Sequence, residues 1–325
     1  MEYFAGKKEL KLNKKIFVLI FAGLIFCLCL SNCGKKNQND NSRYVISKEN
    51  GEIILAYKAF IDFLKTDRSW DNYAKFLLTP YPEIQLVHER QLGWGTIDSV
   101  KFRDDLKEFK TNDYERFLKQ YDTKTLNYLY DSVIMKAHTI LPPVNNKQVD
   151  LCFFLPYGSC FVIPGEDKNT IFISMRINPD DVEKIMAHEY AHILHFERRP
   201  EEPVTLKREI ISEGMAVYFT NQIIDDIEVS NSIPFMSESS FNWCIENEQL
   251  IKDSIGLELN DSSMGVFQRF ISDGRPAKPP EGFVQKTGYF AGYRVIEECI
   301  KKGMKPEEIC RLKSEEIIER SGYFN

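Results

Sequence analysis

The pattern of hydrophobic and polar positions along the chain is mostly helical. Between Lys48 and about Leu141, apolar residues recur with the period of about 3.6 that places them on one face of a helix. The clearest run consists of Ile53, Ile54, Tyr57, Phe60, Ile61 and Phe63. The helices expected from the pattern span 99–109, 112–120 and 124–139, and after residue 213 they span 237–254, 263–271, 287–302 and 305–320.

The middle of the chain has a different pattern. Two short runs, 149–155 and 170–175, are rich in the β-branched and aromatic residues that favour strands. A Pro-Gly-Glu-Asp sequence at 164–167 has the composition of a turn. We therefore predict an α+β fold that is mainly helical, with a small sheet in its middle. A helical N-terminal region is expected over 48–145, followed by a second region over 146–325.

The sequence between Asn178 and Pro200 delimits one helix clearly. Asn178 is a suitable N-cap, Pro179 fits the first helical turn, and the two Asp that follow favour the positive end of the helix dipole. Pro200 ends the helix. Within it lies the sequence His-Glu-Tyr-Ala-His at 188–192, an HExxH motif. Two His four residues apart stand on one face of a helix, one turn apart.

The HExxH motif predicts a metal site. Two imidazoles one turn apart can bind one Zn²⁺ at about 2.0–2.1 Å, and the Glu between them can accept a proton from a zinc-bound water. With only five His in the chain, a chance match is expected on the order of one per cent of the time or less. We therefore expect His188 and His192 to bind the metal and Glu189 to act as general base. The alternative is a degenerate motif whose His pack in the core.

A zinc site of this kind needs a third protein ligand. His195 lies on the same helix face, but it stands roughly 10 Å along the axis from His188, too far to share the ion. Glu213 is the better candidate, because a Glu within the apolar run of a second helix is costly unless it is paired or ligating. Its separation of 21 residues from His192 leaves room for a loop and the approach of that helix. The alternative is a surface carboxylate like Glu209.

Three motifs together resemble a known family. They are His188-Glu189-Tyr190-Ala191-His192, Glu213-Gly214-Met215-Ala216 and Thr287-Gly288-Tyr289-Phe290-Ala291-Gly292-Tyr293-Arg294. In this order, over about residues 125–305, they resemble the predicted zinc-dependent proteases grouped as a domain of unknown function. That family is similar to the HExxH-plus-Glu metallopeptidases called gluzincins. One departure is Lys286, where we expect Trp in the family.

The resemblance implies a gluzincin-like metallopeptidase fold, with the small sheet preceding the zinc-binding helix. It implies that His188, His192 and Glu213 bind Zn²⁺ and that water takes the fourth position. It also implies that an edge strand beside the zinc helix holds an extended peptide by backbone pairing, and we expect residues 170–175 to be that strand.

The third motif offers donors for the oxyanion of the transition state. Tyr289 and Tyr293 are four residues apart, so on a helix both face one way, and their hydroxyls stay protonated near neutral pH. With Thr287 as a cap, Tyr289 would lie in the first helical turn, and it is our first choice before Tyr293 and Arg294. The two glycines of the run favour a functional role, because they lower helix propensity for no evident local gain. The alternative is that both Tyr pack in the core.

Residues 1–32 have the pattern of a targeting segment. Lys residues precede an almost wholly apolar run at 16–30, which is short for a spanning helix. The sequence Leu-Ser-Asn-Cys at 30–33 resembles a bacterial lipoprotein signal, with Cys33 as the lipidated first residue of the mature chain. An ordinary signal peptide or a membrane anchor is the alternative. A flexible tether is expected over 33–47, so that the folded part lies at the cell envelope outside the cytoplasm.

Charge and cysteine content narrow the picture further. Removing residues 1–32, which hold five Lys and two Glu, changes the net charge from −6 to −9, and so acidic a chain argues against a nucleic-acid partner. Cys152 and Cys160 flank a predicted turn and could form a disulfide in an oxidising compartment. Buried free thiols are the alternative.

These features predict an envelope-anchored zinc metallopeptidase that acts on a peptide or protein substrate and is held at the membrane by its N-terminal lipid. The alternative is a non-catalytic, zinc-binding lipoprotein that serves an envelope or motility assembly. Glu189 favours the enzyme, because a structural zinc site has no need of a general base.

Overall fold

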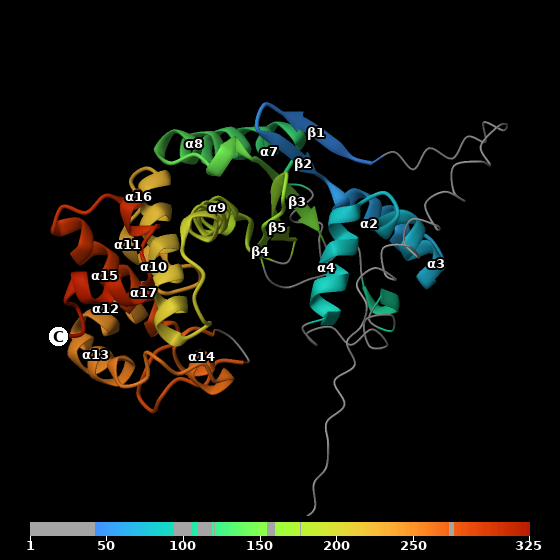
Figure 1. Cartoon of the computed structure of the whole chain (residues 1–325). Coiled ribbons are helices and arrows are strands. Elements are labelled where there is room, and N and C mark those ends of the chain that lie inside the picture. Colours follow the sequence, from blue (N-terminus) through green and yellow to red (C-terminus); the bar gives the residue numbers. More distant parts are fainter. Residues whose placement is uncertain are drawn as a thin grey trace, which may run out of the picture. The chain divides into compact units, whose positions relative to one another are not determined.

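A five-stranded mixed sheet precedes the HExxH helix (Figure 1). The strands follow the order β1-β2-β3-β5-β4 and span Val45–Lys48 (β1), Gly51–Ile54 (β2), Gln148–Phe154 (β3), Phe161–Ile163 (β4) and Lys168–Ser174 (β5). The neighbours β2, β3 and β5 are parallel, while β1 and β4 pair antiparallel. The prediction of an α+β fold, mainly helical with a small sheet, is confirmed.

This computed structural model describes residues 43–325 except 94–103, 105, 110–118, 120, 155–159, 176 and 273–275. The predicted signal peptide at 1–32, the proposed lipidation site Cys33 and most of the predicted tether lie outside the described residues. So do most of the expected helices at 99–109 and 112–120.

The strand β5 lies inside the sheet, and the prediction that residues 170–175 form an edge strand is wrong. Ile171 pairs with Leu151 of β3 on one side and with Val162 of β4 on the other. The residues of β5 after Lys168 are all buried, as expected for a parallel strand covered on both faces. Among the described strands, β4 forms the edge next to β5.

Helices pack on both sides of the sheet (Figure 1). The first, α2 (Ala56–Leu64), packs on β3, whereas α9 (Val182–Arg198) packs on β4 and β5. The other described elements of the N-terminal half are α3 (Trp70–Tyr73), the π-helical η1 (Ala74–Leu78), α4 (Pro82–Gly93), α7 (Thr123–Leu129), the π-helical η3 (Tyr130–Met135), α8 (Lys136–Ile140) and the 3₁₀ turn η4 (Val144–Asn146).

The predicted helical start of this half is wrong at its first two apolar residues. Ile53 and Ile54 lie in β2, and the helix α2 begins only at Ala56. Both side chains are fully buried, and in a short run buried on all sides the apolar spacing does not separate strand from helix. Because β2 pairs with β3, the predicted regions 48–145 and 146–325 share one sheet.

The C-terminal half is helical, close to its predicted pattern. Its described elements are α10 (Leu206–Ile223), α11 (Val229–Ser232), α12 (Glu238–Glu246), α13 (Glu248–Gly256), α14 (Met264–Phe270), α15 (Thr287–Lys301), α16 (Pro306–Ile309) and α17 (Ser314–Ser321). The long α10 packs between α9 and α15 (Figure 1). The predicted helix over 237–254 is divided at Asn247, and the one over 305–320 is divided after α16.

Two glycines allow α10 and α15 to cross closely. A Cβ atom at Gly214 would overlap the backbone of Gly292, and one at Gly292 would overlap the carbonyl oxygen of Ile210. Gly288 is equally confined, because a Cβ there would lie 2.7 Å from the Ile271 side chain. The glycines of the third motif therefore have a packing role, contrary to the inference that they gain nothing locally.

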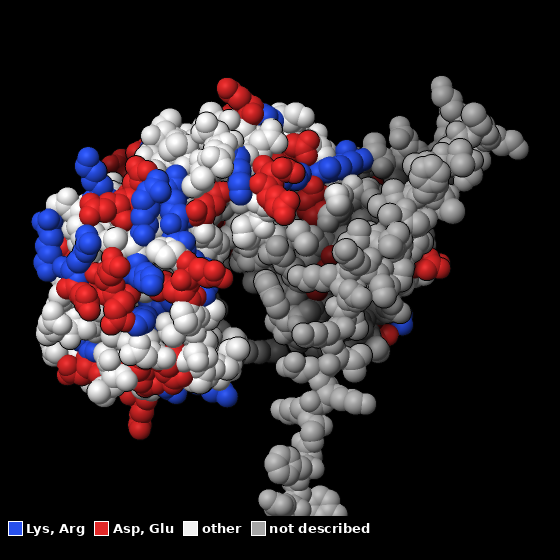
Figure 2. Space-filling model, viewed as in Figure 1, with Lys and Arg blue, Asp and Glu red and all other residues white. Residues whose placement is uncertain are grey.

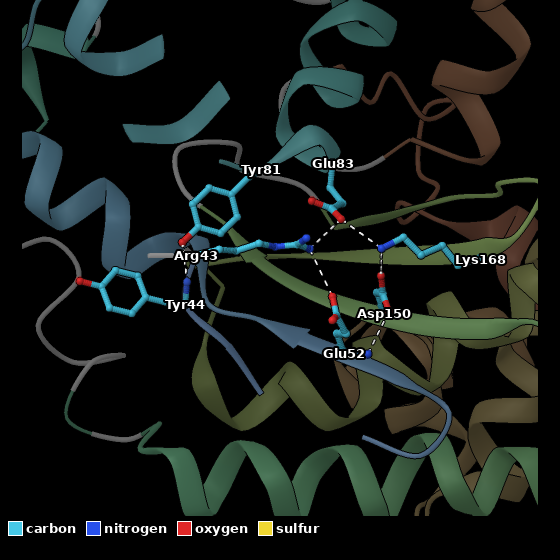
Figure 3. Close-up of polar contacts among 7 residues, drawn as sticks. All are labelled: Arg43, Tyr44, Glu52, Tyr81, Glu83, Asp150 and Lys168. Atoms are coloured by element: carbon cyan, nitrogen blue, oxygen red, sulfur yellow. Dashed lines mark hydrogen bonds and ion pairs between the residues drawn. The ribbon is translucent and has the colours of Figure 1, made fainter. Parts of the chain in front are cut away.

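A group of charged side chains joins the sheet to α4; we call Arg43, Glu52, Glu83, Asp150 and Lys168 the paired-charge cluster (Figure 3). Arg43 contacts Glu83 at 2.8 Å and Glu52 at 3.3 Å. Lys168 donates to Asp150 at 2.5 Å and to Glu83 at 3.1 Å. The second oxygen of Asp150 accepts the backbone N–H of Glu52 at 2.9 Å. The cluster thus fastens β2, β3, β5 and α4 to one another.

The five described cysteines are free thiols, so the disulfide considered for Cys152 and Cys160 is absent. Cys152 lies buried in β3, where burial raises the pKa of its thiol well above the usual value. Over the residues that the structure describes, helices long and apolar enough to cross a membrane are absent. Figure 2 shows Lys and Arg side chains interspersed with Asp and Glu on one face of the molecule.

Candidate metal centre

The helix α9 positions the HExxH motif as the sequence predicts. The side chain of Asn178 accepts from the N–H of Asp180 at 3.5 Å, and Pro179 opens a 3₁₀ turn, η5 (Pro179–Asp181), that leads into the helix. The helix ends at Arg198, two residues before Pro200. All residues from Ile185 to His195 are buried, because α9 lies against β4 and β5 as well as α10. This burial keeps most of the surface of the motif out of contact with solvent.

Two His and one Glu side chain meet between α9 and α10. The Nε2 atoms of His188 and His192 are 3.2 Å apart. One carboxylate oxygen of Glu213 lies 3.1 Å from the first and 3.6 Å from the second. The three ligand atoms lie within 4.8 Å of one another. Among the described residues, these three side chains form the group that could hold a metal ion.

These separations fit a tetrahedral zinc ion. Ligand atoms about 2.0–2.1 Å from a tetrahedral ion lie roughly 3.3–3.4 Å apart. The three observed separations of 3.1, 3.2 and 3.6 Å bracket that value. The donor set, two imidazoles and one carboxylate, is also one that catalytic zinc sites use. His195, one further turn along α9, stands outside this group and is fully buried.

Burial and mutual charges shift the pKa values of the three side chains in different directions. Burial lowers the pKa of His188 to about 4, which keeps its imidazole neutral. Burial also acts to lower the pKa of His192, but the charges of Glu213 and Glu189 outweigh it and raise the value to about 9. Burial alone would raise the pKa of Glu213, yet the two imidazoles hold it well below its usual range. An ionised carboxylate therefore faces one neutral and one protonated imidazole, and a metal ion that binds would displace the proton of His192.

Glu189 lies on the same helix, α9, but is not one of the three side chains that could hold the metal ion. Its side chain is buried, and burial raises the pKa of its carboxyl to about 7. The charge of Glu213 raises it further, whereas His192 and Lys286 lower it. A carboxyl whose pKa lies near neutrality can both accept and release a proton at physiological pH.

The two candidate tyrosines of α15 lie in different surroundings. The ring of Tyr289 stacks on the His188 imidazole, with centroids 6.0 Å apart and planes inclined by 16°. The hydroxyl of Tyr293 donates to Glu297 at 3.4 Å, and Arg294 binds Glu248 and Glu297. Tyr289 is thus the tyrosine of this pair that contacts a predicted metal ligand.

The cap of α15 differs from the expected one. Lys286, not Thr287, is the N-cap residue, and its backbone is left-handed with φ of 63°. Tyr289 still lies in the first helical turn. The Lys286 ammonium lies 4.7 Å from the centroid of the Tyr289 ring, so its charge is close to the site.

Two neighbours of the ligands were not found from the sequence. The Nδ1 atom of His192 shares a hydrogen bond with the Ser212 hydroxyl at 3.3 Å, and the Phe196 ring stacks on the His192 ring with centroids 5.5 Å apart. Ser212 precedes Glu213, and Phe196 follows His192 by one helical turn. Their spacing relative to the ligands is a signal that could have identified them.

Comparison with known proteins agrees with this geometry. Neither the curated proteins nor the solved structures contain a match to the chain. A family model described as "Predicted Zn-dependent protease (DUF2268)" matches residues 123–319, a stretch that contains both α9 and α10. That match covers more than half of the chain, which therefore belongs to this family of predicted zinc-dependent proteases.

Proposed function

We propose that this chain is a zinc-dependent peptidase. The observation that carries the proposal is the convergence of His188, His192 and Glu213, whose ligand atoms lie within 4.8 Å of one another beside Glu189. Three protein ligands are typical of catalytic zinc sites, which leave the fourth position to water, whereas structural sites use four. Membership of a family of predicted zinc-dependent proteases supports the same conclusion.

The chain's own residues supply the proton transfer. When bound, Zn²⁺ lowers the pKa of a coordinated water towards roughly 7 and polarises the scissile carbonyl. Glu189 accepts the proton of the attacking water and passes it to the leaving amine. Its pKa of about 7, a result of burial, suits both transfers near neutral pH. A non-catalytic zinc protein would have no use for this buried carboxyl.

Tyr289 is the proposed oxyanion donor. Its ring contact with His188 places it beside the metal ligands, while the hydroxyl of Tyr293 already donates to Glu297. Replacing Tyr289 with Phe keeps the ring and removes the hydroxyl. We expect turnover to fall roughly 10–10³-fold with zinc content unchanged. Tyr293→Phe is the matched control, and equal losses in both variants would contradict the assignment.

The edge strand β4 is the proposed support for an extended substrate. It packs on α9, and Cys160, directly before it, lies close enough to Glu189 that this charge adds to burial in raising the pKa of the thiol to about 12. A peptide that pairs with this edge passes the general base. Methylating the backbone nitrogens of a peptide substrate should raise KM if such pairing holds it. An unchanged KM for every methylated position would contradict this placement.

We further propose that the chain is anchored at the cell envelope by a lipid on Cys33. The positive region, the apolar run and the Leu-Ser-Asn-Cys sequence before it support this, although all lie outside the described residues. Cys33→Ser should abolish labelling by a fatty-acid probe and release the protein from membranes. Labelling that persists in this variant would place the lipid on another residue, and a parent protein without labelling would point to a plain signal peptide or membrane anchor.

Cleavage of an unfolded protein tests the enzymatic proposal directly. The purified full chain should hydrolyse a reduced, unfolded protein, lose the activity with a zinc chelator and regain it when Zn²⁺ is restored. A protein that binds zinc yet leaves every unfolded substrate intact would favour the non-catalytic alternative.

A further inference from the structure

The two metal-binding His differ in what holds their rings. A His that binds a metal usually donates its other ring nitrogen to a carboxylate, carbonyl or water, and this bond fixes the orientation of the ring. His192 has such a bond, from Nδ1 to the Ser212 hydroxyl at 3.3 Å. The Nδ1 atom of His188 is buried and lacks a hydrogen-bond partner among the residues that the structure describes. Something else must orient the His188 imidazole.

The aromatic contacts of the two His are otherwise alike. Tyr289 stacks on His188 with centroids 6.0 Å apart and planes 16° apart, and Phe196 stacks on His192 at 5.5 Å and 11°. Each ring also carries a cation. The ammonium of Lys286 lies 4.7 Å from the Tyr289 centroid, and the guanidinium of Arg199 lies 4.5 Å from the Phe196 centroid. The Nδ1 hydrogen bond is therefore the main difference between the two sides.

The side chain of Lys286 is held firmly against Tyr289. It is 5% exposed, donates to the carbonyl of Pro234 at 2.8 Å and lies 5.1 Å from the Phe235 ring centroid. Its backbone has φ of 63°, a conformation that glycine adopts at lower cost. The fold keeps a long cationic side chain at this position in spite of that cost, and a largely desolvated cation over a ring face is attracted to it.

We propose that Tyr289 and Lys286 are positioning residues for His188. The Tyr289 ring, held by the Lys286 ammonium, orients the imidazole towards the metal in place of the hydrogen bond that its Nδ1 lacks. This inference rests on the proposed zinc site, and it assigns to the Tyr289 ring a role separate from that of its hydroxyl.

Metal affinity tests the proposal without reference to catalysis. The Kd for Zn²⁺ of the full chain is measured by competition with a chelator. Tyr289→Leu, which removes the ring, should weaken binding about 10–100-fold, the usual loss when an outer contact of a metal-binding His is removed. Tyr289→Phe retains the ring and should bind zinc as the parent does.

Phe196→Leu is the matched control. Both aromatic residues are half-buried and both lie on a metal-binding His, but His192 keeps its bond to Ser212 when Phe196 is replaced. This variant should lose less than about threefold in affinity. Thermal unfolding of the metal-free proteins shows whether the two Leu variants are equally destabilised, which separates positioning from general damage to the fold.

The role of Lys286 is tested by variants that remove or keep the positive charge of its side chain. Lys286→Met keeps the length of the side chain, removes the ammonium and should weaken zinc binding, whereas Lys286→Arg should restore it. An affinity that rises in Lys286→Met would mean that repulsion between the two cations dominates, and it would overturn the role given to this residue.

Each further outcome has a distinct meaning. A parent protein that binds no zinc overturns the proposed function, and this inference with it. Zinc binding by the parent and by Tyr289→Leu with equal affinity overturns only the inference. Equal losses of zinc affinity in Tyr289→Leu and Phe196→Leu would show that stacking serves both His alike, so that Tyr289 does not replace the missing Nδ1 bond. Equal losses of affinity in Tyr289→Leu and Tyr289→Phe would assign the effect to the hydroxyl and overturn the role given to the ring.

Discussion

The paired-charge cluster and the metal centre both remove carboxylates from water, but they balance the charge in different ways. In the paired-charge cluster, Glu83 and Asp150 are 6% and 0% exposed, and each contacts a cationic side chain of the same chain. In the metal centre, the carboxylate of Glu213 faces two imidazoles and the carboxyl of Glu189 is buried nearby. The first group draws its partners from the chain itself, whereas the second collects donor atoms around one point.

This difference separates the buried charges that join elements of the fold from those that could hold a metal ion. Pairing with cationic side chains offsets part of the cost of desolvation and fastens neighbouring elements to one another. Donor atoms that converge on one point gain their full stabilisation only from an added cation. Substitutions in the first group should therefore change stability, and substitutions in the second should change metal content or turnover.

The largest expected effect is the loss of metal from the second group. His192→Ala removes one of three protein ligands, so the variant should lose most of its zinc, while the parent should hold about one ion per chain. Metal analysis of the purified proteins measures this, with Asp150→Asn of the paired-charge cluster as control. Full occupancy in His192→Ala would contradict the metal centre.

Glu189→Gln should lose activity and keep both the metal and the fold. Loss of a general base costs roughly 10²–10⁴ in turnover. The metal-free variant should be at least as stable as the parent, because Gln replaces a buried acid whose pKa burial has raised. Kinetics on an unfolded protein substrate and urea unfolding measure the two quantities. Parent-like turnover would exclude Glu189 as the base.

Asp150→Ala should have the opposite effect on the protein. It removes the partner of Lys168 and of the Glu52 N–H, and we expect the free energy of unfolding to fall by about 2–4 kcal/mol with zinc affinity unchanged. Asp62→Ala, at an exposed ion pair with Lys65, is the control and should cost at most about 1 kcal/mol. Comparable losses in both variants would show that burial of the cluster contributes little.

Acid should lower the stability of the protein through His88, which lies in α4, the helix that also carries Glu83. Burial lowers the pKa of His88 to about 4, below the unfolded value of 6.5. The contribution of the neutral His88 to the free energy of unfolding is complete above pH 6.5. It declines by about 2 kcal/mol as the pH falls from 6.5 to 5, because the unfolded chain takes up the proton first, and it goes on declining towards pH 4. Urea unfolding at several pH values across this range gives the free energy of unfolding. That free energy should fall less steeply with decreasing pH in His88→Gln than in the parent. The same slope in both proteins would place the acid sensitivity elsewhere.

The residues of the candidate metal centre could be predicted from local sequence. The spacing of His188 and His192 determines that their side chains share a helix face, because the helix has a fixed number of residues per turn. The same local logic predicted the cap at Asn178 and the position of Tyr289 in the first turn of α15. Glu213 could be proposed because a carboxylate in an apolar helix needs a partner.

The features that could not be predicted from the sequence depend on contacts between segments that are distant in the chain. The interior position of β5 follows from pairing with both β3 and β4, and the need for Gly214 and Gly292 follows from the crossing of two helices about eighty residues apart in the chain. Apolar spacing is the same for an edge and an interior strand, so it could not distinguish them.

By itself, the sequence determined which side chains form the candidate metal centre, because helical geometry links spacing to direction over a few residues. Only the tertiary structure decided what surrounds them. It placed the Tyr289 ring on His188 with the Lys286 ammonium over that ring, and it placed the Ser212 hydroxyl on His192. These contacts join α9 to α10 and α15, and their geometry depends on how three helices pack rather than on any local period.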